Sequence, residues 1–169
     1  MANVIFITGG QRSGKSTYAQ KRALELSSNP VYIATSRIWD DDFKNRVKTH
    51  QNDRSENWIN IEEEKQISKL DLKDNVVVLD CITLWLTNYF SDNNYNVDQS
   101  LEKAKKEWDK FIKGNFTAFV ITNELGMGVH AQTEGARKFT DLQGWMNQYI
   151  AEKANEVYLM VSGLPMKIK

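Results

Sequence analysis

The strongest constraint on the fold lies at the start of the chain, where residues 4–17 read VIFITGGQRSGKST. A run of β-branched and aromatic residues, Val4–Thr8, leads directly into Gly-x4-Gly-Lys-Ser at residues 9–16, the phosphate-binding loop (P-loop) pattern. Glycines let the backbone turn its N–H groups toward phosphate oxygens, Lys15 adds a compact positive charge, and the Ser16 hydroxyl can ligate Mg²⁺. The pattern therefore predicts a strand, a loop and a helix that together hold a nucleoside triphosphate.

Short apolar runs bounded by turn residues recur along the chain and predict strands buried on both faces of a parallel sheet. These runs are Val4–Thr8, Val31–Ala34, Val76–Asp80, Phe119–Thr122 and Val157–Val161. Helical patterns separate or flank them at Lys15–Ser27, Asp42–Arg54, Glu62–Leu70, Asp98–Lys113 and Glu134–Ala154. We therefore expect a single doubly wound α/β domain over residues 1–169, with helices on both faces and ligands at the carboxyl ends of the strands.

Composition narrows the classes of partner. The 22 basic and 22 acidic residues give zero net charge, so the chain lacks the basic footprint of nucleic-acid or anionic-membrane binding. No apolar stretch approaches the roughly 20 residues of a membrane span, and the strand-like N-terminus lacks the basic start of a signal peptide. The single cysteine, Cys81, excludes an intrachain disulfide and is typical of a small buried residue in a reducing compartment. We expect a cytoplasmic protein.

An acidic residue closes one of the apolar runs. Val76–Asp80 reads Val-Val-Val-Leu-Asp, and in P-loop folds an acid at the end of such a strand lies near the Mg²⁺. Many strands also end in aspartate simply because a turn follows. Given the P-loop, we expect Asp80 and Ser16 to form the metal site.

The two histidines lie in different settings. His130 follows two glycines in a loop, and we expect it to be exposed and passive. His50 lies in a very polar segment, residues 45–54, and composition alone favours a solvated position on a helix surface. However, a neutral imidazole with a pKa of about 6.5 is a competent nucleophile toward phosphorus, and basic neighbours such as Arg46 and Arg54 could hold the triphosphate that it attacks.

Several segments together resemble one family. They are residues 8–16 (TGGQRSGKS), 32–36 (YIATS), 46–54 (RVKTHQNDR) with Trp58, 79–83 (LDCIT), 122–128 (TNELGMG) and the tail 161–169. In order and spacing they resemble the bifunctional adenosylcobinamide kinases/adenosylcobinamide-phosphate guanylyltransferases over essentially the whole chain. The P-loop alone indicates only a superfamily. The histidine segment together with residues 122–128 makes the resemblance specific.

The resemblance implies a RecA-like P-loop NTPase domain that assembles as a homotrimer. It implies phosphorylation of adenosylcobinamide by a nucleoside triphosphate, then transfer of GMP from GTP to adenosylcobinamide phosphate, with GTP, ATP and Mg²⁺ as cofactors and a corrinoid as substrate. His50 falls on the family's guanylylated histidine, and Thr49 stands where some relatives have a second histidine. With Lys15 as the other catalytic residue, the implied nucleotide-binding residues are Gly9, Gly10, Gln11, Arg12, Ser13, Gly14, Lys15, Ser16, Ala34, Thr35, Ser36, Gln51, Asn52, Asp53, Arg54, Glu62 and Leu84.

Two other interpretations keep the P-loop. In the first, the protein is a simple small-molecule kinase without nucleotidyl transfer, and His50 is structural. In the second, it is a nucleotide switch or an oligomeric NTPase subunit that binds nucleotide without transferring phosphate to a small acceptor. Covalent labelling by GTP separates both from the bifunctional enzyme, because only a nucleotidyl-transferring histidine retains the α-phosphate.

Overall fold

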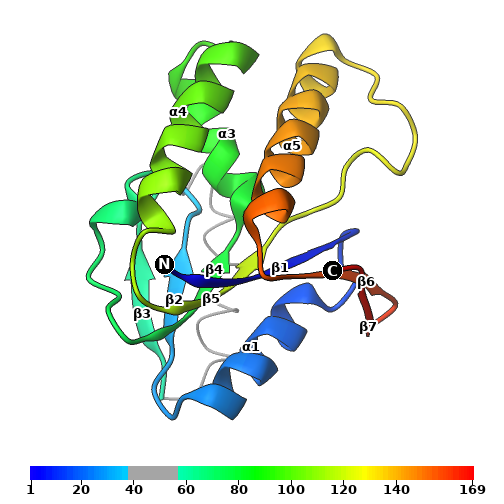
Figure 1. Cartoon of the computed structure of the whole chain (residues 1–169). Helices are drawn as coiled ribbons and strands as arrows, with labels where there is room; N and C mark the ends of the chain where they lie inside the picture. The colour runs from blue at the N-terminus through cyan, green and yellow to red at the C-terminus, as the bar shows by residue number, and fades with distance from the viewer. Residues whose placement is uncertain (38–56) are drawn as a thin grey trace.

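The computed structural model describes residues 1–37 and 57–169, which form a seven-stranded sheet covered by helices (Figure 1). The strand order across the sheet is β3-β2-β4-β5-β1-β6-β7. All neighbouring strands pair in parallel except β7, which is antiparallel to β6. The strands are β1 (Asn3–Gly9), β2 (Val31–Ala34), β3 (Ile59–Glu62), β4 (Val76–Asp80), β5 (Thr117–Ile121), β6 (Glu156–Val161) and β7 (Leu164–Lys167).

The helices divide between the two faces of the sheet. Helix α1 (Lys15–Leu26) covers one face, while α3 (Ile82–Asp92), α4 (Val97–Phe111) and α5 (Glu134–Lys153) cover the other (Figure 1). A single turn of 3₁₀ helix, η1 (Ile67–Lys69), packs against α4. This three-layer arrangement confirms the doubly wound α/β fold expected from the sequence.

Alternation along each strand builds two separate cores. In β1, Val4 and Phe6 contribute to the core beneath α3, α4 and α5, whereas Ile5 and Ile7 pack on the α1 side. Because both faces are covered, the strand has no polar side that faces water, and its sequence is a continuous apolar run. The sequence therefore revealed the central strands clearly.

The position of β5 in the sheet identifies the subtype of P-loop fold. Strand β5 lies between β1, which leads into the P-loop, and β4, which ends in Asp80. This inserted strand is the arrangement of RecA-like domains, and it confirms the expected fold class. Ile121 of β5 pairs with Ile7 of β1 on one side and with Asp80 of β4 on the other. The carboxyl ends of these three strands therefore meet at one edge of the sheet.

Polar side chains cap the N-termini of two helices in the three-helix layer. The Asn96 side chain accepts a hydrogen bond from the N–H of Gln99 at the start of α4. The Thr133 hydroxyl accepts one from the N–H of Ala136 at the start of α5. Such caps satisfy N–H groups that have no partner within the helix, which explains why these two helices start close to where their sequence patterns placed them.

Four elements differ from the sequence-based expectation. The helix predicted over Glu62–Leu70 is wrong, because Glu62 ends strand β3 and only η1 is helical in that region. Helix α3 and strands β3 and β7 were not predicted at all. The helix predicted over Asp42–Arg54 lies outside the described residues.

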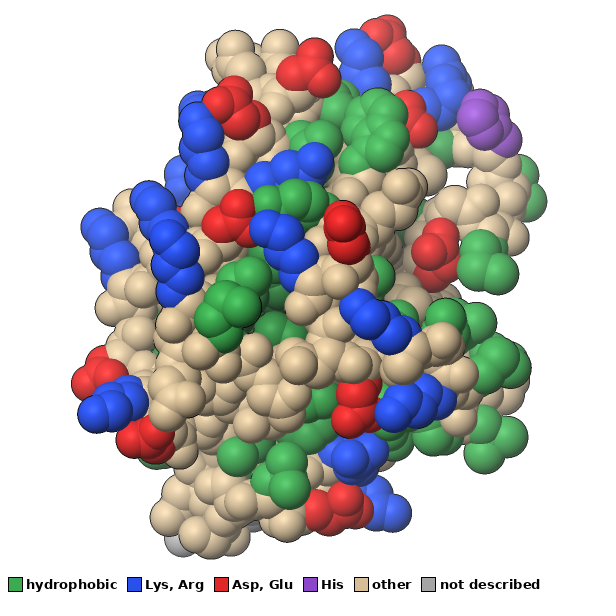
Figure 2. Space-filling model, in the orientation of Figure 1, with side chains coloured by type: hydrophobic (Ala, Val, Ile, Leu, Met, Phe, Trp, Pro, Cys, Tyr) green, Lys and Arg blue, Asp and Glu red, His purple; other side chains and the backbone are tan. Residues whose placement is uncertain are grey.

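Acidic and basic side chains are interspersed over the face of the molecule that Figure 2 shows, without a large patch of either sign. This distribution agrees with the zero net charge of the sequence. Among residues 1–37 and 57–169, no helix has the length and apolar character that crossing a membrane requires.

Candidate active site

The P-loop connects β1 to α1 with the backbone geometry that its glycines permit. Gly9 has φ 151° and Gly14 has φ 92°, a region that residues with a side chain rarely adopt. A Cβ on Gly9 would also lie only 2.7 Å from the Met160 carbonyl oxygen and 2.8 Å from the Ser13 Oγ. Both glycines are therefore required by the loop's shape.

Lys15 lies folded back into this loop. Its side chain is buried, with 7% of the residue exposed, and its Nζ donates to the Gly10 carbonyl at 2.6 Å and to Ser13 Oγ at 3.5 Å. Burial lowers the pKa of the Lys15 ammonium, while the neighbouring Cys81 and Asp80 act in the opposite direction. Oxygens of the loop thus hold the lysine where phosphate oxygens of a nucleotide would bind.

Asp80 lies directly beside the first turn of α1. Its Oδ2 accepts a hydrogen bond from Ser16 Oγ at 2.9 Å and another from the Tyr32 hydroxyl at 2.6 Å. The structure therefore brings together the two residues that the sequence assigned to the metal. Tyr32 was not predicted, although a polar-tipped aromatic residue within a buried strand next to β4 was the available signal.

These two oxygens suit Mg²⁺, which prefers hard hydroxyl, carboxylate, phosphate and water oxygens. Within the described parts of the chain, no group of three or more His, Cys, Asp and Glu side chains converges into a protein-only metal site. A P-loop magnesium ion takes most of its ligands from nucleotide phosphates and water. Ser16 and Asp80 therefore fit the protein share of such a site.

The loop that follows β2 is fastened to the loop that follows β4. Thr35 Oγ1 accepts from the Cys81 N–H at 2.9 Å and donates to the Cys81 carbonyl at 2.7 Å, and the Asp80–Cys81 peptide bond is cis. Cys81 is a buried free cysteine, and burial raises the pKa of its thiol to about 12. The expectation of a small buried cysteine is confirmed, and Ala34 and Thr35 lie beside Asp80 and Cys81 at the end of β4.

Glu62 and Leu84 occupy the borders of this region. Glu62 ends β3 opposite Ala34 in the parallel register and is exposed. Leu84, in the first turn of α3, is half-buried against the core on the α1 side. The structure thus places Ala34 and Glu62 side by side at the carboxyl edge and makes Leu84 partly a packing residue.

Strand β5 delivers a third loop to the same edge. The N–H of Asn123 donates to Thr83 Oγ1 at 3.0 Å, and the N–H of Glu124 donates to the Gly9 carbonyl at 3.0 Å. The first bond attaches the Thr-Asn-Glu-Leu-Gly-Met-Gly segment to α3, and the second attaches it to the start of the P-loop. They were not predicted from the sequence, which does not show which loop peptides meet across a sheet edge.

The C-terminal hairpin also contacts the P-loop. The N–H of Gly163, between β6 and β7, donates to the Ser13 carbonyl at 3.0 Å, and a Cβ on Gly14 would lie 3.1 Å from the Gly163 Cα. Two glycines thus allow two backbones to pass closely. The Ser-Gly pair at the end of the last predicted strand was the only sequence signal for this support.

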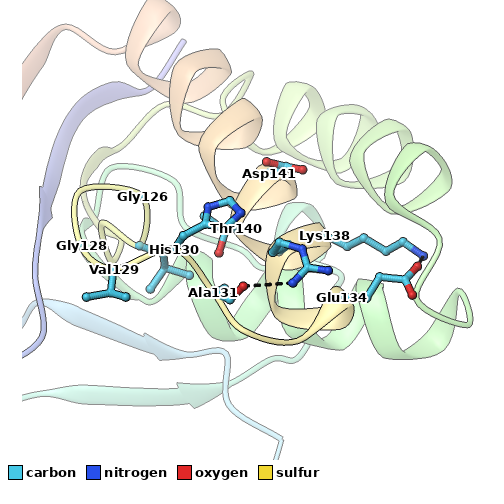
Figure 3. A pocket seen from close by; sticks show the side chains of 11 residues that line it. Gly126, Gly128, Val129, His130, Ala131, Glu134, Lys138, Thr140 and Asp141 are labelled. Carbon is cyan, nitrogen blue, oxygen red and sulfur yellow. Dashed lines mark hydrogen bonds and ion pairs between the residues drawn. The ribbon is translucent and has the colours of Figure 1, made fainter.

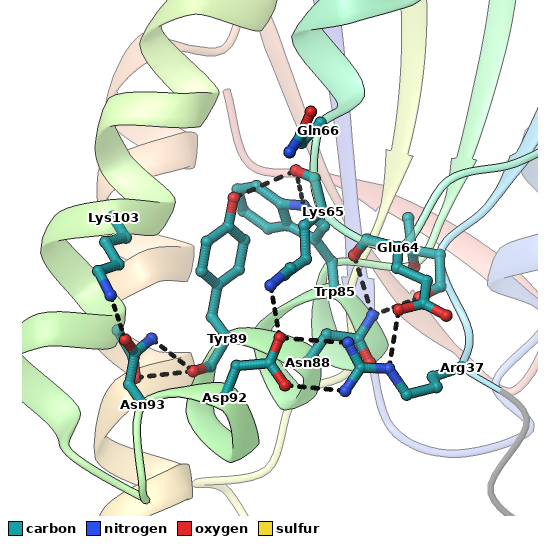
Figure 4. A network of polar contacts seen from close by, with 12 residues as sticks. Arg37, Glu64, Lys65, Gln66, Trp85, Asn88, Tyr89, Asp92, Asn93 and Lys103 are labelled. Carbon is teal, nitrogen blue, oxygen red and sulfur yellow. Dashed lines mark hydrogen bonds and ion pairs between the residues drawn. The ribbon is translucent and has the colours of Figure 1, made fainter.

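A polar network holds the loops after β2 and β3 against α3 (Figure 4). The Asn88 side-chain amide donates to the carbonyls of Thr35 at 2.8 Å and Glu64 at 2.9 Å. Arg37 pairs with Asp92 at 2.9 Å and with Glu64 at 2.7 Å, and Lys65 also pairs with Asp92. These contacts fix the end of the described segment that precedes residue 38.

The remaining residues of the predicted site divide into two groups. Gln11 and Arg12 are exposed at the tip of the P-loop, where Arg12 has φ 56°. His50 and Gln51–Arg54 lie outside the described residues. His130 is exposed, as expected.

Comparison with known proteins assigns the family. A family model described as cobinamide kinase / cobinamide phosphate guanyltransferase matches residues 5–168. The chain belongs to this family. It is therefore an enzyme of the cobinamide kinase / cobinamide phosphate guanyltransferase family, and the resemblance seen in the sequence is confirmed.

Relatives extend over the same length. The bifunctional adenosylcobalamin biosynthesis protein CobU of Escherichia coli (strain K12) is 38% identical, covering 98% of this chain and 99% of the relative. CobU of Salmonella typhimurium is 35% identical with the same coverage. The bifunctional protein CobP of Pseudomonas aeruginosa is 34% identical over 96% of this chain and 95% of its own.

One solved structure of low sequence identity supports the fold alone. A structure from Pyrococcus horikoshii OT3, from a structural study of Project ID PH0250, aligns with a TM-score of 0.51 at 9% identity, covering 99% of this chain and 86% of that chain. A RadB recombinase aligns with a TM-score of 0.48 at 16% identity over 92% of this chain and 73% of that chain.

Proposed function

We propose that this enzyme phosphorylates adenosylcobinamide with a nucleoside triphosphate and then transfers GMP from GTP to adenosylcobinamide phosphate. The observation that carries the proposal is the placement of Ser16 against Asp80 at 2.9 Å, beside the buried Lys15 of the P-loop. These are the parts that phosphoryl transfer requires of a protein, namely a cradle for phosphates, a fixed cation and a hard oxygen pair. The identity of the acceptor comes from the family description, which names cobinamide and cobinamide phosphate.

In the kinase step, the P-loop orients the triphosphate and Lys15 stabilises the negative charge that develops on its phosphates. An acceptor hydroxyl oxygen forms a bond to the γ-phosphorus and loses its proton to water, the bond to the β,γ-bridging oxygen breaks, and the nucleoside diphosphate leaves. Mg²⁺, held by Ser16 and Asp80, would neutralise charge on the β- and γ-phosphates. The loop peptides and Lys15 are preorganised for this charge, which is usually a large share of catalysis.

In the transfer step, the proposal assigns the nucleophile to His50. An imidazole nitrogen forms a bond to the α-phosphorus of GTP and pyrophosphate departs, which leaves a guanylyl-histidine. A phosphate oxygen of adenosylcobinamide phosphate then forms a bond to the same phosphorus and the N–P bond breaks. The products are adenosylcobinamide-GDP and free histidine. The nucleotide contacts proposed for Gln51–Arg54 belong to this step.

Labelling tests the proposal directly. Protein incubated with GTP labelled at the α-phosphate should become covalently labelled, and the label should be lost in acid and persist in base, as expected of a phosphoramidate. Adenosylcobinamide incubated with protein and γ-labelled ATP or GTP should gain the label. Labelled acceptor without labelled protein would instead indicate the simple small-molecule kinase, and neither label would indicate a nucleotide switch.

We further propose that the enzyme is a cytoplasmic homotrimer. The antiparallel edge strand β7 and the residue after it expose Leu164, Met166 and Ile168, at 72%, 57% and 61% of their areas. A row of exposed apolar side chains on a strand edge is typical of a surface that another subunit covers. Sedimentation should give three times the 19.5 kDa chain mass, and a monomer across the working concentration range would refute the trimer.

A further inference from the structure

A cavity of about 540 Å³ opens between the loop that follows β5 and the first two turns of α5. Figure 3 shows its lining side chains. Its volume lies within the usual range of small-molecule sites. Resting on the proposed function, we propose that this cavity binds one edge of the corrinoid acceptor.

The cavity lies at the correct edge of the sheet for an acceptor. Its first lining residue, Leu125, directly follows Glu124, whose N–H donates to the Gly9 carbonyl of the P-loop at 3.0 Å. In open α/β sheets, ligands gather outside the carboxyl ends of the strands. The Leu125 end of the cavity is thus joined through Glu124 to the start of the P-loop, and no P-loop residue lines the cavity.

The loop side of the lining suits a corrinoid, which combines an apolar macrocycle with primary amides around its rim, whereas the α5 side is polar and charged. Leu125 and Val129 expose 38% and 93% of their areas beside the cavity. Gly126 and Gly128 also line it, and a Cβ on Gly128 would meet no atom within 4 Å. The wall thus offers apolar side chains for the ring and bare peptide groups for the amides.

Arg137 provides a fixed donor on the opposite wall. Its Nη1 donates to the Ala131 carbonyl at 3.2 Å and to the Gln132 carbonyl at 2.7 Å, which ties the end of the loop to α5. Within the described part of the chain, its Nε and Nη2 make no hydrogen bond to protein, so they remain available for carbonyl oxygens of the acceptor's amides. The neighbouring Lys138 is instead paired with Glu134 at 2.6 Å.

A second cavity does not compete for this role. A groove of about 440 Å³ lies between α4 and α5, and its lining includes Trp145 and Tyr149. None of its lining residues belongs to a strand or to a loop that directly follows one. An acceptor bound there would lie on the helical layer, away from the edge that carries the P-loop.

Val129→Glu tests the assignment, because a side chain that is 93% exposed can be replaced without disturbing the core. We expect the KM for adenosylcobinamide to rise at least tenfold, because a carboxylate would face the apolar macrocycle. The KM for the nucleotide and covalent labelling by α-labelled GTP, which needs no corrinoid, should stay unchanged. The matched control is Leu26→Glu, at a 58% exposed position on α1, which should leave all three values unchanged.

Arg137→Ala gives a second readout of the same site. It should also raise the KM for adenosylcobinamide at least tenfold while labelling by GTP persists, and the melting temperature shows whether the variant is folded. Active wild-type enzyme with an unchanged acceptor KM in both folded variants would overturn the cavity assignment alone. Wild-type enzyme that binds GTP but never turns over adenosylcobinamide would overturn the proposed function and, with it, this inference.

Discussion

The Tyr32 hydroxyl donates a hydrogen bond of 2.6 Å to Asp80 Oδ2. The same oxygen accepts the bond from Ser16, so two donors on two different elements orient one carboxylate. Tyr32 is in turn braced by Trp58, whose ring lies edge-on to it with centroids 5.9 Å apart. The position of the proposed metal ligand is therefore determined by the core on the α1 side as well as by the P-loop.

Substitutions of Asp80 and Tyr32 should both raise the Mg²⁺ concentration that the enzyme needs, and the Asp80 substitution should raise it more. Asp80→Asn removes the charge but keeps the size, and we expect the Mg²⁺ concentration for half-maximal activity to rise tenfold or more. Tyr32→Phe removes one hydrogen bond of about 1 kcal/mol, which corresponds to a rise of about fivefold. Tyr18→Phe is the control, because the Tyr18 hydroxyl contacts Arg22 instead. Unchanged magnesium titrations of both test variants would reduce Asp80 to a turn residue.

Lys15→Ala should impair both half-reactions, because both need the triphosphate seated in the P-loop. Loss of one preorganised charge beside a transferring phosphate costs about 3–4 kcal/mol in the barrier, or roughly a hundredfold to a thousandfold in rate. Lys21→Ala removes an exposed lysine from the same helix and should be nearly silent. Turnover near normal in either half-reaction of Lys15→Ala would exclude the P-loop from that step.

His50→Ala should separate the two activities. We expect no covalent label from α-labelled GTP and no guanylyl transfer, while phosphorylation of adenosylcobinamide continues, because only the transfer step uses the imidazole. His130→Ala is the matched control for labelling, since His130 is exposed on the loop after β5. Equal loss of both activities in a folded His50→Ala protein would show that the histidine serves a shared step.

The Arg37–Asp92–Lys65 network should make stability depend on pH. Hydrogen bonds from Arg37 and Lys65 hold the pKa of Asp92 well below its usual range. Asp92 therefore stabilises the fold at pH values above its unfolded pKa of about 4, and this contribution is lost as the pH falls through the lower pKa of the folded state.

Asp92→Asn measures that contribution. Because the network is partly exposed, we expect about 1 kcal/mol at pH 7, or a melting temperature lower by about 2–4 °C. The difference from the wild type should begin to shrink at about pH 4 and go on shrinking as the pH is lowered toward the depressed pKa of the folded state. Glu102→Gln breaks only an exposed pair with Lys106 on α4 and should change the melting temperature little. A difference for Asp92→Asn that is independent of pH would contradict the assignment.

Cys81 should be inert in the folded enzyme. Burial raises the pKa of its thiol to about 12, so almost no thiolate is present at pH 8. We expect a thiol-specific disulfide reagent to react only after denaturant is added, with one equivalent released per chain. Rapid reaction of the native protein would mean that the loop between β4 and α3 opens readily.

The sequence predicted those parts of the fold whose pattern follows from burial. Strands β1, β4 and β6 are covered on both faces, so their apolar runs are unbroken. Helix α3 was missed because it is buried on most sides, at Ile82, Trp85, Leu86 and Phe90 among others. A helix without a polar face shows no helical period, and β-branched and aromatic residues favour strands.

Around Glu62, local hydrogen bonds outweigh the helix propensity of the sequence. The Glu-Glu-Glu-Lys-Gln run favours a helix, yet Glu63 Oε1 accepts from the N–H groups of Lys65 and Gln66 and closes a turn instead. Strand β7 was hidden for a different reason. All its residues are exposed and it contains Pro165, which is tolerated only because β7 is an edge strand.

The candidate site was predictable where one motif contains it and not where it is assembled from distant segments. Lys15, Ser16 and Asp80 follow from two local patterns, and the structure brings them together. The supports of the site join positions far apart in the chain, such as Thr35 with Cys81 and Ser13 with Gly163. Such pairings depend on the strand order, which a single sequence does not specify.

The hydrogen bond from Gly163 to Ser13 affects when the P-loop can finish folding during translation. The P-loop is synthesised before the strands that flank β1, which are β5 and β6, and the hairpin that supports the loop follows β6. Strand β1, which leads into the P-loop, therefore has no neighbouring strand to pair with until β5 and β6 have been synthesised. In this topology the P-loop gains its last backbone support only after residue 163 has been synthesised, so a chain cut short before that residue lacks the bond from Gly163 to Ser13.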